Sequence, residues 1–149
     1  MMLPRAIAYA STLESELCAA FQRLAEAERT DPEFAESCRM LSAQADGRAS
    51  ALLVWAERYP CDGFSHDRPV RAELRSVEPR IGLWNLRVLV RQCGTAWAMV
   101  ERAAVTADQR QLLDLVTTGR AALAKGAVWL EENIGPRPRP ALAGLDRSA

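Results

Sequence analysis

The sequence predicts an all-α protein, a bundle of four helices made of two hairpins. Apolar residues recur at steps of three and four along four stretches, which is the spacing of an amphipathic helix, and only this periodicity is present. Short turns join the first stretch to the second and the third to the fourth, whereas a long irregular stretch separates the two pairs. The two halves also resemble each other in sequence. A chain of 149 residues with 49% hydrophobic residues is long enough for one domain with a sizeable core.

The first hairpin is expected to contain helices at about 7–24 and 34–59. The apolar side of the first helix comprises Ile7, Ala10, Glu14, Leu17, Phe21 and Leu24. The same side of the second helix comprises Phe34, Cys38, Leu41, Ala45, Arg48, Leu52, Trp55 and Tyr59. Between them, Thr30 and Glu33 have the spacing of a capping box, and Pro32 is compatible with the first turn of a helix.

The second hairpin is expected to contain helices at about 83–100 and 112–133. The apolar side of the first of these helices comprises Leu83, Leu86, Val90, Cys93, Trp97 and Val100. That of the second comprises Leu112, Leu115, Gly119, Ala122, Gly126, Trp129 and Asn133. Thr106 and Gln109 again have capping-box spacing. The tryptophans on these sides are interpreted as apolar packing residues.

Residues 1–135 are therefore expected to form the bundle, with a crossover at about 60–79, followed by a Pro/Arg-rich tail at 136–149. His66, the only histidine, falls in the crossover near Cys61. Because the spacing matches no strong zinc signature, an ordinary polar loop is the preferred interpretation, with a metal site as the alternative.

The two hairpins align as an internal repeat. Leu17 aligns with Cys93, and Phe21 aligns with Trp97. In the second helix of each hairpin, "VWAE" is matched by "VWLE". Two short-turn hairpins joined by a long crossover form the arrangement of ferritin-like bundles, as opposed to a simple up-down-up-down bundle.

The stretch "ELCAAFQRLAEAERTDPEFAESCRMLSAQADGRASALL" resembles the first hairpin of rubrerythrin-like members of the ferritin-like superfamily. The resemblance covers about residues 5–134 and rests on the apolar pattern and the layout of the helices. It implies a four-helix bundle around a di-iron centre. The ligands of such a centre are a Glu on the first helix of each hairpin and a Glu-x-x-His on the second.

Most of these ligands are missing from the chain. The positions that the resemblance assigns to them hold Glu14, Ala45, Arg48, Val90, Gly119 and Ala122. Only Glu14 retains a metal-binding group, and a di-iron site needs several carboxylates to neutralise and position the metals. We therefore expect no metal and no other cofactor, and the loss of the iron and oxygen chemistry that the family name implies.

Arg48 is the only basic residue on the apolar side of its helix. Glu14 and Arg48 are at nearly equal separations from the turn at Thr30, so antiparallel packing places them at the same height. A bidentate Glu14–Arg48 pair would repay much of the cost of burying both charges. The alternative is a helical phase that differs by one residue, with Arg48 extending to solvent.

Two functional hypotheses follow from this pattern. The first is a non-catalytic scaffold, adaptor or accessory protein. The alternative is a bundle that binds a small molecule or a metal, with oxidoreductase-like chemistry, in a residual cavity around Glu14 and Arg48. The small residues Ala45, Gly119 and Ala122 distinguish the two, since a filled layer favours the scaffold and an open layer favours the binding protein.

Composition restricts the partners. Nineteen basic residues balance nineteen acidic ones, so no net charge attracts nucleic acid or an anionic membrane. No apolar run is long enough to span a bilayer, and acidic residues lie where a signal peptide would be cleaved, so we expect a cytoplasmic protein. A protein partner or a homodimer is expected instead.

Two segments are candidates for contacting a partner. The first is a basic stripe with one aromatic residue, formed by Arg80, Trp84, Arg87 and Arg91, for which a solvated helix flank is the competing interpretation. The second is the tail, whose apolar residues Leu142 and Leu145 follow an extended Pro/Arg segment; a tail without a binding role is the alternative.

Removal of the tail tests both of its interpretations. A chain that ends at Gly135 should keep its thermal unfolding midpoint within about a few degrees of the full-length value, because few buried contacts are lost. If Leu142 and Leu145 anchor a partner, the same truncation should abolish its co-purification. Aggregation of the truncated chain would show instead that the tail packs on the bundle.

Overall fold

The computed structural model describes residues 2–59 and 79–134, which form four α-helices and no strand. The helices are α1 (Met2–Ala27), α2 (Pro32–Arg58), α4 (Pro79–Thr106) and α5 (Arg110–Ile134). The predicted all-α class and the four helices are confirmed. The expected crossover and the tail, with His66, Leu142 and Leu145, lie outside the described residues.

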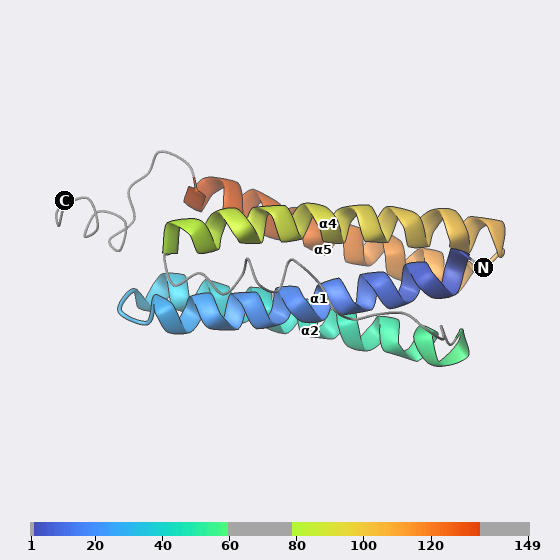
Figure 1. Cartoon of the computed structure of the whole chain (residues 1–149), viewed down its shortest axis with the longest axis horizontal. Coiled ribbons are helices and arrows are strands. Elements are labelled where there is room, and N and C mark those ends of the chain that lie inside the picture. Colours follow the sequence, from blue (N-terminus) through green and yellow to red (C-terminus); the bar gives the residue numbers. More distant parts are fainter. Residues whose placement is uncertain (1, 60–78, 135–149) are drawn as a thin grey trace.

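The directions of the helices follow from the colours in Figure 1. α1 and α2 are antiparallel, as are α4 and α5, whereas α2 and α4 run in the same direction. The last residue of α2 and the first residue of α4 therefore lie at opposite ends of the bundle (Figure 1). The chain between the two hairpins consequently connects opposite ends, which a tight turn cannot do.

Packing between the helices is uneven. α1 packs along both α2 and α4, and α4 also packs along α5, whereas α2 and α5 have a small interface. Aromatic residues contribute to the contact between the hairpins: Phe34 of α2 stacks on Trp129 of α5 at 5.1 Å between ring centroids, and Phe21 of α1 meets Trp129 edge-on at 6.4 Å. Of the four described helices, α1 thus has the most extensive contacts and α5 the least extensive.

The core consists mainly of leucine, alanine and aromatic side chains. The largest fully buried apolar side chains are Trp97, Phe21, Ile7, Leu13, Leu17, Leu52, Leu83, Leu86, Leu89, Leu112 and Leu130. Each contributes roughly 1.5–3 kcal/mol relative to an exposed position, which offsets the conformational entropy lost on folding.

The buried side of α5 agrees with the prediction at Leu112, Gly119 and Gly126, which are buried, and differs from it at three other positions. The expected positions Leu115, Ala122 and Trp129 are only half-buried. The residues that follow each of them are buried instead: Val116, Leu123 and Leu130. The reason is that α5 packs mainly on α4, so its apolar side is rotated toward α4 and away from α2.

Both predicted capping boxes are wrong. The N-cap of α2 is Asp31, whose Oδ1 accepts a hydrogen bond from the Phe34 backbone N–H at 3.2 Å. An aspartate at this position satisfies an N–H that has no intrahelical partner, so Thr30 is not needed. α4 extends through Thr106, whose hydroxyl donates to the Arg102 carbonyl oxygen at 3.0 Å and is therefore not a cap for α5.

The position of the α2 cap can be tested by a pair of substitutions. Asp31→Ala should lower the free energy of unfolding by about 1 kcal/mol, because the Phe34 N–H loses its acceptor. Thr30→Ala, one residue earlier and exposed, serves as the control and should change it little. Urea denaturation of both variants measures the difference, and equal effects would contradict the assignment of Asp31.

Candidate functional site

A buried carboxylate lies at the centre of the bundle. The Glu14 side chain of α1 is fully buried. The Arg48 Nε of α2 donates a hydrogen bond to Glu14 Oε1 at 2.9 Å, which confirms the predicted pair. The Trp97 Nε1 of α4 donates to the same oxygen at 2.8 Å. We call these three residues the Glu14 cluster; it joins three helices through one oxygen atom.

Local sequence explains why Arg48 can reach this position. Its side chain is 10% exposed, so most of its aliphatic stem is covered. Ala45 and Ala49 are buried nearby on α2, and their small side chains leave volume for a long neighbour. Arg48 is thus part of the core boundary and does not extend freely into solvent.

The geometry of the pair differs from the expected bidentate arrangement. Both donors converge on Oε1, and Glu14 Oε2 is buried without a hydrogen-bond partner among the described residues. An unsatisfied buried acceptor costs about 1–3 kcal/mol. The cluster therefore places a positive charge beside Glu14 but leaves one of its two carboxylate oxygens without a hydrogen bond.

The Trp97 ring fills the space beside Gly119 of α5. A Cβ atom at Gly119 would lie 2.9 Å from two carbon atoms of the indole, closer than such contacts occur. Trp97 is fully buried, so its ring has little freedom to move away. The layer that the sequence marks as small is thus filled at Gly119 by an aromatic side chain.

The other predicted positions of the residual site are apolar in character. Ala45 and Val90 are buried, and Ala122 is half-buried. None of these side chains has an atom that binds a metal. Over residues 2–59 and 79–134, the structure places no three His, Cys, Asp or Glu side chains close enough together to hold a metal ion.

Trp97 is the functional residue that sequence reasoning missed, because its ring was assigned to apolar packing alone. A buried indole N–H requires an acceptor, and Glu14 is the only carboxylate on the expected apolar side of any helix. This requirement was the available signal. A second polar contact lies one turn further along α1, where Ser42 Oγ donates to the Cys18 carbonyl oxygen at 2.9 Å.

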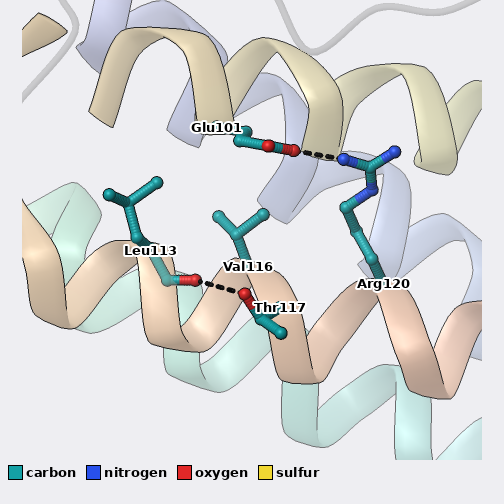
Figure 2. A pocket seen from close by; sticks show the side chains of 5 residues that line it. All are labelled: Glu101, Leu113, Val116, Thr117 and Arg120. Carbon is teal, nitrogen blue, oxygen red and sulfur yellow. Dashed lines mark hydrogen bonds and ion pairs between the residues drawn. The ribbon is translucent and has the colours of Figure 1, made fainter. Parts of the chain in front are cut away.

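A small pocket lies between α4 and α5, and none of the three residues of the Glu14 cluster lines it. Figure 2 shows its lining residues, which are Glu101, Leu113, Val116, Thr117 and Arg120. Its volume is about 260 Å³, below the usual size of small-molecule sites. Glu101 and Arg120 form an ion pair with each other, and the Thr117 hydroxyl donates to the Leu113 carbonyl oxygen (Figure 2). Its polar side chains are thus already engaged within the protein.

The stripe of Arg80, Trp84, Arg87 and Arg91 on α4 carries less free positive charge than its sequence indicates, because one of its arginines lies beside an acidic residue. Trp84 is 50% exposed, and the Arg87 guanidinium lies over its ring at 5.0 Å. Arg87 Nε is 2.6 Å from Glu131 Oε1 of α5, close enough for an ion pair although not aligned as a hydrogen bond. Arg91 is exposed, and the side chain of Arg80 lies outside the described part of the chain.

Comparisons with family models, with curated proteins and with solved structures find no match to this chain. None of the four described helices is both long and apolar enough to cross a membrane. The candidate site is therefore interpreted from its own geometry.

The energetic role of the pair can be measured with a mutant cycle. Arg48→Ala should cost about 3–5 kcal/mol of folding stability, because it leaves the buried Glu14 carboxylate without its positive partner. The double variant Glu14→Leu/Arg48→Met should recover much of this loss, since it removes both charges together. Chemical denaturation provides the values, and an Arg48→Ala variant as stable as the wild type would refute the role of the pair.

Proposed function

We propose that this protein is a ferritin-like bundle without a di-iron site that acts as a non-catalytic scaffold, adaptor or accessory protein. The observation that supports this function is the Glu14 cluster. At the position where the resemblance implies metal ions, Glu14 is bonded to Arg48 and Trp97, and the indole fills the space beside Gly119.

Electrostatics argues against metal binding at this position. A cation would have to displace the Arg48 guanidinium from Oε1 or bind beside a positive charge. A single carboxylate would then be its only anionic ligand, because the other five implied positions hold no acid.

The topology supports the ferritin-like part of the proposal. Two antiparallel hairpins with α2 and α4 in the same direction require a connection between opposite ends of the bundle. This is the arrangement of ferritin-like folds with one long crossover. The internal repeat in the sequence agrees with an origin by duplication of one hairpin.

The alternative function, ligand binding in a residual central cavity, is less well supported. It requires open volume around Glu14 and Arg48, whereas Trp97 occupies the space beside Gly119 and Ala45 is fully buried. Large apolar side chains are instead exposed on the outside of the bundle, for example Met40, Leu53, Trp84 and Val128. Exposed apolar side chains are suited to contacts with other proteins.

The loss of the metal site predicts the iron content. Protein purified from iron-rich medium, or incubated with ferrous iron under air and desalted, should contain no stoichiometric iron, because the ligand set is missing. Elemental analysis measures the content, with a rubrerythrin treated identically as the positive control. About two irons per chain would overturn the proposal.

The double variant that removes the buried ion pair also tests the proposed function in cells. If the centre of the bundle is structural, Glu14→Leu/Arg48→Met should replace the wild-type protein in cells whose phenotype depends on it. Loss of that phenotype, in a variant that is folded and equally abundant, would favour the alternative of chemistry at the centre.

A further inference from the structure

The outward side of α2 has an unusual distribution of charge. Met40, Gly47 and Val54 lie one heptad apart on the side opposite the buried residues of α2, and Met40 and Val54 are each 55% exposed. Between Met40 and Val54 this side contains only uncharged residues, namely Ala43, Gln44, Gly47, Ser50 and Ala51. The exposed side of a surface helix normally carries charged residues. We call this surface the outer α2 face.

Charges of opposite sign lie at the two ends of the outer α2 face. Glu36 is one turn before Met40, and Arg58 is one turn after Val54. Both charges are exposed. Glu36 is paired with Arg39 on the same helix at 3.0 Å, but both side chains are largely exposed, so this pair is weak and free to rearrange.

The face is complementary to itself when one copy is reversed. Gly47 lies midway between Met40 and Val54, and also midway between Glu36 and Arg58. In an antiparallel pair of α2 helices with a two-fold axis at Gly47, each residue meets the one equally far on the other side of the axis. Met40 then packs on Val54 of the second copy, and Glu36 faces its Arg58.

One flank of the face also carries opposite charges, although they are not equally far from Gly47. Arg39 and Glu57 lie on one side of the outer α2 face, and equal flanks meet in an antiparallel two-fold pair. Arg39 is eight residues before Gly47 and Glu57 is ten residues after it, so Arg39 lies within about one helical turn of Glu57 of the second copy. Asp46 lies on the same flank, about 100° around the helix from Gly47 and next to the axis, so it comes near Asp46 of the second copy and this like-charge contact opposes the dimer. The charges at both ends of the pair thus meet opposite charges, whereas a parallel pair would place Glu36 against Glu36.

Gly47 permits the two helices to approach closely at the crossing point. A Cβ atom added there would meet nothing within 4 Å, so the glycine is not required by the fold of the bundle. Glycine inside an exposed helix lowers helix stability, which calls for another reason for its presence. Close approach of a second backbone is such a reason.

We propose that the outer α2 face binds a second copy of this chain in an antiparallel two-fold dimer that crosses at Gly47. This deepens the scaffold function by naming its surface, but it does not depend on the absence of metal. Because one helix per subunit contributes, the interface belongs to the small class, and we expect a dissociation constant in roughly the micromolar range.

A charge at the two-fold axis tests the face directly. Gly47→Glu places two carboxylates against each other in the dimer, while the isolated bundle should be as stable as the wild type or more so, since the helix gains propensity. Sedimentation equilibrium should show a dissociation constant raised about tenfold or more. Ala124→Glu, on an exposed position of α5, is the matched control and should leave it unchanged.

Charge reversal tests the orientation. Glu36→Arg and Arg58→Glu should each weaken the dimer. Residue 36 of each copy faces residue 58 of the other, so either single change creates two contacts between like charges. The double variant should restore the wild-type affinity. Weakening by both single changes without rescue in the double variant would contradict the antiparallel register.

A cross-link gives a third readout. Gly47→Cys should form a disulfide-linked dimer under mild oxidation, since residue 47 meets its own copy at the axis, whereas Ala124→Cys should not. A wild-type protein that stays monomeric at about millimolar concentration, or a dimer insensitive to Gly47→Glu, would overturn the proposal.

Discussion

The Glu14 carboxylate is the constraint on which the rest of the bundle depends. It is fully buried, and its Oε1 accepts hydrogen bonds from Arg48 of α2 and Trp97 of α4. A shift of either helix along or around its axis would leave a charge in the core without a partner, which is more costly than a lost apolar contact. We interpret the cluster as a device that specifies the register of three helices, even though the pair itself adds little net stability.

In the proposed function, the cluster gives the bundle a polar centre whose charge is balanced by a side chain. In the proposed ancestry, cations neutralised the inward carboxylates; here the Arg48 guanidinium supplies the positive charge from a covalently attached side chain. The remaining volume is taken by the Trp97 ring, which requires glycine at position 119. These changes depend on one another, since the arginine needs the single carboxylate and the indole needs both its acceptor and the glycine.

Adjacent residues of α2 connect the interior with the surface. Arg48 is held toward Glu14, and this bond sets the rotation of α2 about its axis. The same rotation places Gly47 outward, in the middle of the uncharged outer α2 face. In this proposal, the buried ion pair determines which surface is available to a second copy, because a helix that turned around its axis would present charged residues instead.

The sequence by itself determined the helices and one of the central contacts. Apolar periodicity predicted four helices, and the nearly equal separations of Glu14 and Arg48 from the turn predicted their pairing, because antiparallel geometry depends only on local spacing. The internal repeat and the ferritin-like relationship remain predictions from the sequence.

Tertiary structure alone decided the remaining features of the fold and the site. The rotation of α5 depends on how much of its surface packs on α4, and the choice of Asp31 over Thr30 as N-cap depends on the final path of the turn. The Trp97 hydrogen bond joins residues far apart in the chain. Such contacts arise from packing between helices, which periodicity along one helix does not encode.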